Sequence, residues 1–244
     1  MVLGEFMAMS EIYRHNPSFV PQPLARGTYD SLDGVHFLLC EFRDMDSSKL
    51  PDLERFPALV ADMHRTITSR DGRFGFGCTT YHGNVPIEHG WSDSWEEYFI
   101  RTTRVLIDME QEARGRNAEI LDLAGPLFEE VVPRLLRPLE TGSKPIRPSL
   151  IHGDLWNGNT ATDKKTSEPI IFDAAGFYAH NEYELAVWRQ PWNEIGAPYR
   201  ARYCRHFPPA EPADEFDDRG ELYSVRVNLL DSILYKDDEN YRHT

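Results

Sequence analysis

The sequence predicts a mixed α/β fold with two unequal parts. A small N-terminal part contains one helix and a strand hairpin, and a larger part is mostly helical. Two observations support this prediction. Apolar residues recur at helical spacing in several long stretches of the chain. Short apolar runs bounded by turn residues occur near the N-terminus and again in the middle of the sequence.

The N-terminal part is predicted to be a helix followed by a hairpin. Residues 1–15 carry apolar side chains at near-helical spacing and end before Asn16-Pro17, a pair that favours a helix stop. Two strand-like runs follow, at residues 24–29 and 35–42. The residues between these runs are rich in Asp and Gly and are typical of a turn.

The larger part is predicted to be built mainly of helices. Apolar residues at helical spacing predict helices at residues 52–70, 95–109, 120–136, 181–188 and 222–234. Ser94 or Asp93 could cap the second of these. We interpret His64, near the end of the first, as a charge that complements the helix dipole. The Gly-rich, aromatic segment between the first two helices is predicted to form a long loop.

The segment with the clearest chemical signal combines two carboxylates and an amide. Asp154 and Asn159 are five positions apart and follow the apolar run 150–151, while Asp173 follows a second apolar run, 170–172. Two short strands on either side of a charged turn are typical of a hairpin-like unit. Such a unit would bring Asp173 beside Asp154 and Asn159.

This oxygen-rich group suits Mg²⁺, a hard cation that binds few protein ligands and completes its shell with phosphate and water. The spacing His-x-Asp-x-x-x-x-Asn, followed by an Asp after a strand, is that of a phosphoryl-transfer loop. In this interpretation Asp154 accepts a proton from the substrate hydroxyl, and Asn159 and Asp173 hold the metal. Taken singly, each Asp would be an ordinary turn residue. We interpret His152 as structural, and Trp156 as either a core residue or a platform for substrate.

A family resemblance follows from these residues. Protein kinases have Arg where this chain has Gly153, and Gly is typical of small-molecule kinases with the same fold. The surrounding sequence resembles the fructosamine kinase, or ketosamine 3-kinase, family through Trp156, Gly158-Asn159, Phe172-Asp173-Ala174-Ala175, Tyr178 and Glu182-x-Glu184. That family usually has Pro in place of Ala174 and Asp in place of Glu184, and both departures leave Asp173 untouched.

The resemblance implies a protein-kinase-like fold with two lobes. Residues 1–42 would be the remainder of a small N-lobe that ends in the hinge, and residues 43–244 would form the helical C-lobe. The backbone of Glu41, Phe42 and Arg43 would bind adenine.

The resemblance also implies roles for further side chains. Glu5 would be the helix residue that pairs with a phosphate-binding Lys. Glu182 and Glu184 would brace the catalytic loop, and Trp91 and Asn84 would contact the sugar acceptor.

The implied activity is ATP- and Mg²⁺-dependent phosphorylation of the sugar 3-hydroxyl of ketosamines, on glycated proteins or small amines. The family's Gly-rich hairpin and Lys strand have no counterpart here, because no Lys occurs before Lys49. We expect this difference to impair the use of ATP. A non-catalytic binding protein therefore stays open as an alternative, as does a kinase of aminoglycosides or amino alcohols. A hydrolase that uses Asp154 and His152 is the weakest alternative.

Composition narrows the range of partners. The net charge of −14 argues against nucleic-acid binding, which needs a basic surface. No apolar run is long enough to span a membrane, and the N-terminus lacks the basic start of a signal peptide. The three cysteines show no spacing typical of a disulfide framework or a zinc site. We therefore expect a cytoplasmic protein, either a monomer or a homodimer paired through an exposed strand edge.

Overall fold

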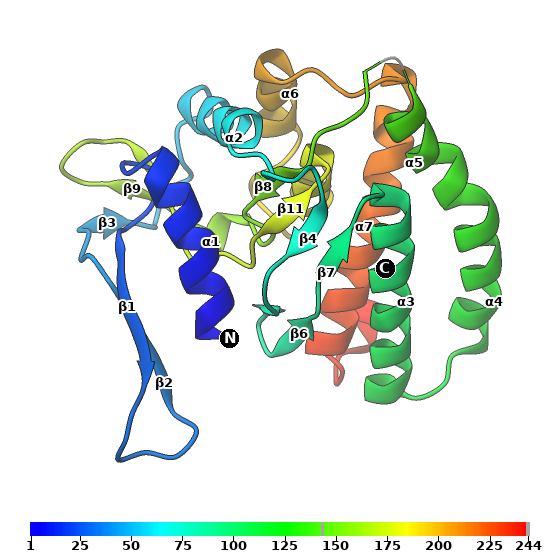
Figure 1. Cartoon of the computed structure of the whole chain (residues 1–244), viewed down its shortest axis with the longest axis horizontal. Helices are drawn as coiled ribbons and strands as arrows, with labels where there is room; N and C mark the ends of the chain where they lie inside the picture. Colours follow the sequence, from blue (N-terminus) through cyan, green and yellow to red (C-terminus); the bar gives the residue numbers. More distant parts are fainter. Residues whose placement is uncertain (143, 243–244) are drawn as a thin grey trace.

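The computed structural model describes residues 1–142 and 144–242. Helix α1 (Val2–His15) is followed by the antiparallel hairpin of β1 (Pro23–Thr28) and β2 (His36–Cys40), which confirms the predicted N-terminal helix and hairpin. The hairpin projects away from the rest of the molecule, whereas α1 lies along the side of the main body (Figure 1). The two-stranded sheet of β1 and β2 contains no other strand among the described residues.

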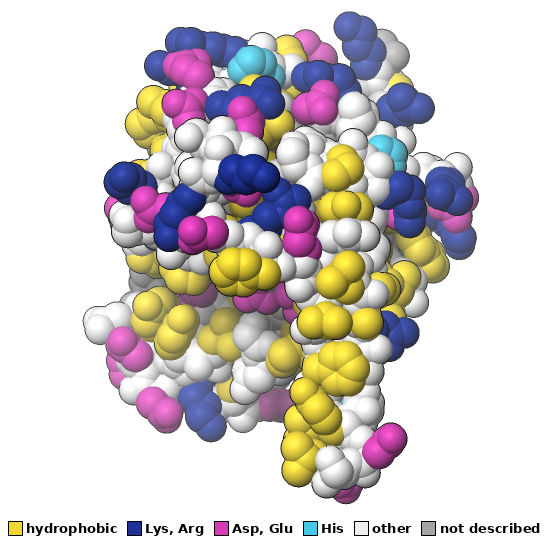
Figure 2. All heavy atoms as spheres, turned by 90° about the vertical axis from the view of Figure 1, so that its left-hand side faces the viewer, with side chains coloured by type: hydrophobic (Ala, Val, Ile, Leu, Met, Phe, Trp, Pro, Cys, Tyr) yellow, Lys and Arg dark blue, Asp and Glu magenta, His cyan; other side chains and the backbone are white. Residues whose placement is uncertain are grey.

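The projecting hairpin carries exposed apolar side chains. Figure 2 shows hydrophobic side chains gathered along the part of this face that extends from the body. The exposed large apolar residues of the hairpin and its turn are Leu24, Tyr29, Leu32, Val35 and Leu39. Whether a second copy pairs with this hairpin stays a prediction, as does the division of the chain after residue 42.

Helix α1 packs closely against the body of the protein. Its buried residues Ala8, Met9 and Ile12 join the hydrophobic core. At Gly4 a Cβ atom would lie 2.6 Å from the carbonyl oxygen of Thr79. Only glycine allows so close an approach of helix and strand, and this contact seats α1 beside the segment that leads into β5 (Thr80–His82).

The larger part is mainly helical, as predicted. Its α-helices are α2 (Arg55–Thr66), α3 (Trp95–Arg114), α4 (Ala118–Pro126), α5 (Val132–Thr141), α6 (Ala197–His206) and α7 (Phe216–Leu234). Ser94 caps α3, and its hydroxyl oxygen accepts a hydrogen bond from the backbone of Glu97. The helix predicted at residues 120–136 is divided by a π-helical turn at Leu127–Val131, beside two prolines that lack a backbone donor.

The segment between α2 and α3 differs from its prediction. It contains β4 (Phe74–Phe76), β5, β6 (Val85–Ile87) and β7 (Gly90–Ser92), so the prediction of a loop is wrong. Strand β4 pairs with β7 on one side and with β11 (Phe177–Ala179) on the other, and β11 also pairs with β8 (Ser149–Ile151). These four strands form one sheet of order β7-β4-β11-β8. Strands β5 and β6 pair with each other as a tight hairpin. The pairing of β4 with β11, which lies far along the chain, is not revealed by a local sequence pattern.

The hairpin in the centre of the chain also differs from its prediction. Strand β10 (Pro169–Ile171) pairs with the polar strand β9 (Thr160–Asp163), and β3 (Met45–Asp46) pairs with the other edge of β9. The apolar run 150–151 belongs instead to β8 and pairs with β11. The predicted pairing of the two apolar runs with each other is therefore wrong, because each run is buried in a different sheet.

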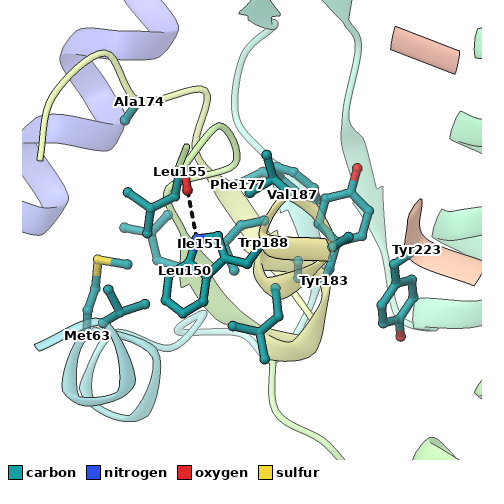
Figure 3. Packing of buried hydrophobic residues seen from close by; sticks show 14 of the residues in the cluster. Met63, Leu150, Ile151, Leu155, Ala174, Phe177, Tyr183, Val187, Trp188 and Tyr223 are labelled. Atoms are coloured by element: carbon teal, nitrogen blue, oxygen red, sulfur yellow. Dashed lines mark hydrogen bonds between the residues drawn. The ribbon is translucent and has the colours of Figure 1, made fainter. Parts of the chain in front are cut away.

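The core lies beneath the central segment. Figure 3 shows Leu150, Ile151 and Phe177 packed around Trp188. The indole nitrogen of Trp188 donates a hydrogen bond to the carbonyl oxygen of Leu155 at 2.7 Å. Trp188 belongs to η3 (Asn181–Arg189), which is a 3₁₀-helix. Across the described ranges, no helix is both long and apolar enough to cross a membrane.

Candidate active site

The candidate site is a cavity of about 560 Å³ that is lined by residues within 153–173, here called the central segment, and by α7. Asp154, Asn159 and Asp173 all line it, so the structure brings together the three residues that the sequence singled out. They meet although the predicted strand pairing is wrong, because β8 and β10 both deliver their following residues to the same place. The other lining residues are His82, Gly83, Gly153, Trp156, Tyr183, Glu184, Val187, Trp192, Val227, Leu230, Asp231, Leu234, Tyr235 and Tyr241.

Asp154 is held as a carboxylate. The side-chain amide of Asn159 donates hydrogen bonds to the backbone oxygen of Asp154 at 2.8 Å and to its Oδ2 at 3.1 Å. Nδ1 of His82 lies 3.6 Å from Oδ1 of the same carboxylate. Burial acts to raise the pKa of Asp154, but His82, His152 and Asn159 together hold that pKa below its usual value. An ionised carboxylate in this position can accept a proton.

The backbone before Asp154 has a conformation that requires glycine. Gly153 has a φ of 83°, and a Cβ there would lie 2.5 Å from the carbonyl oxygen of Ala175. His152 is fully buried, with Nε2 2.9 Å from the carbonyl oxygen of Phe172. Its Nδ1 accepts a hydrogen bond from the backbone nitrogen of Asp154. These contacts agree with a structural role for His152, since both ring nitrogens are used to shape the loop.

Glu184 braces this loop, as the resemblance implied. Its carboxylate accepts hydrogen bonds from the backbone nitrogens of His152 and Gly153, the latter at 2.9 Å. Nε2 of His64 lies 3.4 Å from the same carboxylate, and Nδ1 of His64 lies 2.8 Å from the hydroxyl of Tyr203. His64 is fully buried, and its two ring nitrogens face side chains from other elements, so the interpretation of it as a charge that complements the helix dipole stays a prediction.

Glu182 has a different role from the expected one. It accepts hydrogen bonds from Arg219 and from the backbone of Ala210, and no hydrogen bond joins it to the loop at 152–154 among the described residues. The expectation that both glutamates brace the loop therefore holds for Glu184 alone. On the 3₁₀-helix η3, two residues two positions apart face different sides, because three residues complete a turn.

Asn159 and Asp173 form a donor set that fits Mg²⁺. The amide nitrogen of Asn159 is used by Asp154, which leaves its carbonyl oxygen available to a cation. Asp173 is exposed and has a φ of 62°, a left-handed conformation that Asp adopts more readily than most residues. In the described ranges, no group of three or more His, Cys, Asp or Glu could hold a metal by itself. Mg²⁺ does not need such a group, because phosphate and water supply its remaining ligands.

The residues expected to bind the nucleotide lie outside this cavity. Burial, followed by the charge of Asp173, raises the pKa of Glu5 to about 7. Glu5 therefore lies within electrostatic reach of the proposed metal ligand. The backbone nitrogen of Glu41 donates to Gln22, and the Arg43 side chain lies 2.9 Å from Glu41, which fixes the segment after β2. Phe42 is 88% exposed.

The three predicted substrate contacts are placed differently. Trp156 lines the cavity, and its ring centre lies 6.1 Å from that of Trp192. Trp91 stacks on Tyr178 in the sheet, and Asn84 is exposed in the turn between β5 and β6. Neither Trp91 nor Asn84 lines the cavity, so their contact with substrate stays a prediction.

Sequence reasoning missed several residues that the fold brings to the cavity. His82 comes from β5, Trp192 from the segment after η3, and Asp231 from α7. None belongs to a recognisable motif. The helical spacing in α7 predicted its apolar face, but it contained no signal that Asp231 would line the same cavity as Asp154.

The solved structures with a similar fold support the kinase-like architecture. A protein of Haemophilus somnus assigned as a fructosamine-3-kinase has a TM-score of 0.73 at 18% identity and covers 99% of this chain and 75% of its own. An aminoglycoside phosphotransferase has a TM-score of 0.60 at 14% identity and covers 98% of this chain and 80% of its own. The predicted protein-kinase-like fold is confirmed.

The sequence comparisons identify the family. A ketosamine-3-kinase of Mus musculus is 42% identical over 116 residues, which are 47% of this chain and 35% of that protein. A chloroplastic protein-ribulosamine 3-kinase of Arabidopsis thaliana is 30% identical over 231 residues, 91% of this chain and 64% of that protein. The chain thus spans less than two thirds of the length of these relatives. The family model described as fructosamine kinase matches residues 1–240, and the chain belongs to that family.

Proposed function

We propose that this protein is a kinase that transfers a phosphoryl group from ATP to the sugar 3-hydroxyl of a ketosamine, either a fructosamine or a ribulosamine. The observation that carries the proposal is the meeting of the Asp154 carboxylate with Asn159 and Asp173 in one cavity. The names of the mouse and plant relatives support the choice of acceptor. The acceptor amine would belong to a small molecule or a glycated protein.

In this proposal Asp154 orients the substrate hydroxyl and accepts its proton as the phosphorus–oxygen bond forms. Its depressed pKa keeps it ionised at neutral pH, and the amide of Asn159 fixes its direction. A base positioned in this way contributes roughly 10²- to 10⁴-fold to the rate. Glu184 acts through the backbone of the loop, since it holds the peptide groups just before Asp154.

Asn159 and Asp173 would hold Mg²⁺ in this proposal. When bound, the ion neutralises charge on the transferred phosphate. Such charge compensation matters here because the described residues that line the cavity include no Lys or Arg. We propose that adenine lies along the backbone of Glu41, Phe42 and Arg43, and that Glu5 acts on the phosphate side of the site, near Asp173.

The first experiment measures nucleotide binding and turnover in the same preparation. ATP is titrated by calorimetry with and without Mg²⁺, and phosphorylation of a fructosyl amine is followed by product analysis. We expect Mg²⁺-dependent ATP binding that Asp173→Ala weakens. We expect Asp154→Asn to lower turnover by about 10²- to 10⁴-fold and to leave ATP binding intact. Asp122→Asn, an exposed change on α4, is the control.

Two outcomes would favour the other functions that the sequence left open. ATP binding without any product, in a folded wild-type protein, would indicate a non-catalytic binding protein. Phosphorylation of aminoglycosides or amino alcohols, with none of the fructosyl amine, would keep the roles of Asp154, Asn159 and Asp173 and change the acceptor.

A further inference from the structure

The cavity contains one more carboxylate than the proposed phosphoryl transfer uses. Its described lining contains one histidine, His82, and four carboxylates: Asp154, Asp173, Glu184 and Asp231. Three of the carboxylates have a place in the proposed reaction, as base, metal ligand and brace of the loop. Asp231 has none, although it lines the same cavity from α7.

Asp231 is held in a defined position. Its Oδ2 accepts a hydrogen bond from the indole nitrogen of Trp192 at 3.1 Å. Burial raises the pKa of this carboxyl to about 6, and the charges of His82 and Asp154 also act on it. A half-buried carboxylate gains from the arrival of a further positive charge, because desolvation disfavours its charged form. Asp231 is therefore suited to form an ion pair with a cationic group of a ligand.

Aromatic rings line the same cavity as this carboxylate. Trp156, Trp192, Tyr235 and Tyr241 line the cavity, and the rings of Tyr235 and Tyr241 stack with their centres 4.6 Å apart. The faces of Trp and Tyr rings attract cations. A carboxylate next to several such rings is suited to an alkylated ammonium, which offers a charge, few hydrogen-bond donors and an apolar substituent.

A second cavity begins at the same place. It has a volume of about 270 Å³, and Trp192, Asp231 and Tyr241 line both cavities. Asp231 therefore lies where the two spaces adjoin. One space contains the proposed base Asp154, and the other leads away from it. A substrate with a sugar on one side of a charged nitrogen and a chain on the other side matches this division.

We propose that Asp231, with Trp192 and Tyr241 beside it, binds the protonated secondary amine of the ketosamine substrate. The sugar then extends towards Asp154 and the amine's substituent extends into the second cavity. This inference rests on the proposed function and deepens it, since it assigns the part of the site that distinguishes a ketosamine from a neutral sugar. Asp231 is a positioning residue that does not take part in proton transfer.

The test compares two probes that differ in one atom. The first is 1-butylamino-1-deoxyfructose, the ketosamine that forms from glucose and butylamine, and the second is 1-O-butylfructose, which has oxygen in place of the amine nitrogen. Calorimetry at pH 7.5 measures the binding of each probe to the wild type, to Asp231→Asn and to the control Asp122→Asn. The Asn side chain keeps a carbonyl oxygen as acceptor for Trp192 and removes the charge.

We expect the wild type to prefer the amine over the ether. In Asp231→Asn the affinity for the amine should fall by about 10- to 100-fold, and that for the ether should change little. In the kinase assay the same variant should raise KM for the amine substrate and largely retain kcat. A merely structural role would lower the binding of both probes and lower kcat, and that result would overturn the proposal.

The charge state of Asp231 gives a second readout. His82, Asp154, Tyr235, Tyr241 and Asp238 are the titratable groups around it. Binding of the amine at pH 6 should release protons, detected as a dependence of the binding enthalpy on the buffer, and Asp231→Asn should remove this release. Equal proton release in the variant, or no preference for the amine in the wild type, would also overturn the inference.

Failure of the proposed function would look different. If the amine binds selectively and Asp231→Asn abolishes that preference, while no phosphorylated product forms, the amine subsite stands and the kinase activity does not. If the product forms with equal KM in the wild type and Asp231→Asn, the kinase activity stands and the amine subsite does not.

Discussion

Glu182 and Glu184 lie two residues apart on η3, and both side chains are buried, yet they stabilise different parts of the molecule. Glu182 binds the guanidinium of Arg219 through two hydrogen bonds, of 2.7 and 3.0 Å, and so connects η3 to α7. Glu184 binds backbone nitrogens of the loop that carries Asp154. Two similar carboxylates thus serve the fold and the candidate active site, respectively.

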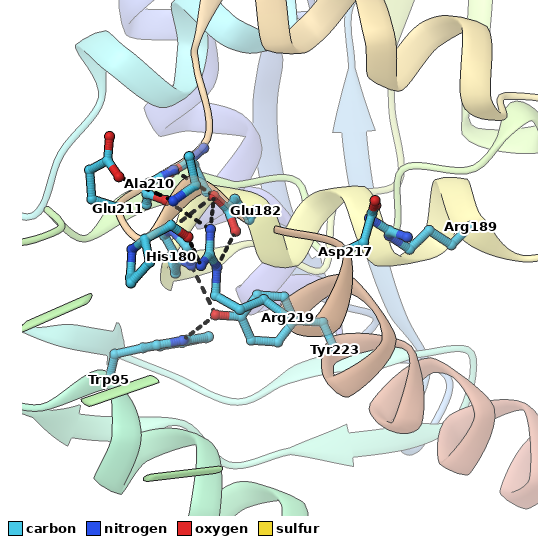
Figure 4. A network of polar contacts seen from close by, with 12 residues as sticks. Trp95, His180, Glu182, Arg189, Ala210, Glu211, Asp217, Arg219 and Tyr223 are labelled. Carbon is cyan, nitrogen blue, oxygen red and sulfur yellow. Dashed lines mark hydrogen bonds and ion pairs between the residues drawn. The ribbon is translucent and has the colours of Figure 1, made fainter. Parts of the chain in front are cut away.

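The surroundings of Glu182 form one polar network. Figure 4 shows Glu182 and Arg219 beside His180, and Tyr223 between His180 and Trp95. The hydroxyl of Tyr223 lies 2.9 Å from Nδ1 of His180 and accepts a hydrogen bond from the indole nitrogen of Trp95, also at 2.9 Å. Glu184 has no Lys or Arg partner among the described residues. The role of each of these buried carboxylates therefore depends on the group that it binds, and not on its position in a sequence motif.

The largest effect on stability is expected from Glu182→Gln. It leaves the guanidinium of Arg219 buried without a charged partner, which should lower the free energy of unfolding by roughly 3–5 kcal/mol. Urea unfolding measures this change. Turnover per folded molecule should stay the same, because Glu182 does not contact the loop. The double variant with Arg219→Met should regain part of the loss, and a double variant as unstable as the single one would contradict the explanation.

Glu184→Gln is expected to affect activity more than stability. The amide keeps one acceptor oxygen but cannot serve both backbone nitrogens, so the free energy of unfolding should fall by about 1–3 kcal/mol. The loss of order at residues 152–154 should lower kcat, with ATP affinity largely retained. Unchanged kcat in a folded Glu184→Gln protein would separate the loop contact from catalysis and remove the contrast with Glu182.

The network of Glu182 should also make stability depend on pH. Burial lowers the pKa of His180 to about 4, from the usual value of about 6.5. Between these values the unfolded chain binds a proton that the folded chain excludes. The contribution of His180 to stability is thus complete above pH 6.5 and is lost as the pH falls towards 4. Urea midpoints from pH 7.5 to 4.5 should fall less steeply in His180→Gln, and parallel curves would refute this assignment.

The smallest effect is expected at Arg134 on α5, which forms ion pairs with residues at the start of α7. Arg134 lies 3.1 Å from Glu215 and 2.7 Å from Asp218, and more than half of its side chain is exposed. Arg134→Ala should change the free energy of unfolding by about 0–1 kcal/mol, because water and salt screen such pairs. Thermal unfolding at low and high salt measures the difference. A loss as large as that of Glu182→Gln would show that burial is not what distinguishes the two ion pairs.

Much of the helical architecture could be predicted from the sequence. The first helix, the hairpin after it, α3 with its Ser94 cap and the last helix all follow from the spacing of apolar residues or from local turn and cap signals. The segment with Asp154, Asn159 and Asp173 could also be recognised, because its signal is a set of residue types at fixed spacing within one stretch of chain.

The strand partners of the central segment could not be predicted. Strands of three or four residues carry little pattern of their own, and β4, β8 and β11 find one another across long separations. The run 170–172 therefore looked like the partner of 150–151, although its actual partner is the more polar β9.

Most of the helices, the family and the three residues at the centre of the candidate site can be recognised from the amino-acid sequence, whereas α6 and the division of the helix predicted at residues 120–136 cannot. The features that can be recognised depend on local propensity and on spacing within short stretches. Three contacts follow from the packing of distant elements: His82 lies beside Asp154, His64 is buried against Glu184, and Asp231 borders the same cavity. The physical reason is that burial and charge at these residues depend on elements distant in the chain, whose packing no local pattern describes.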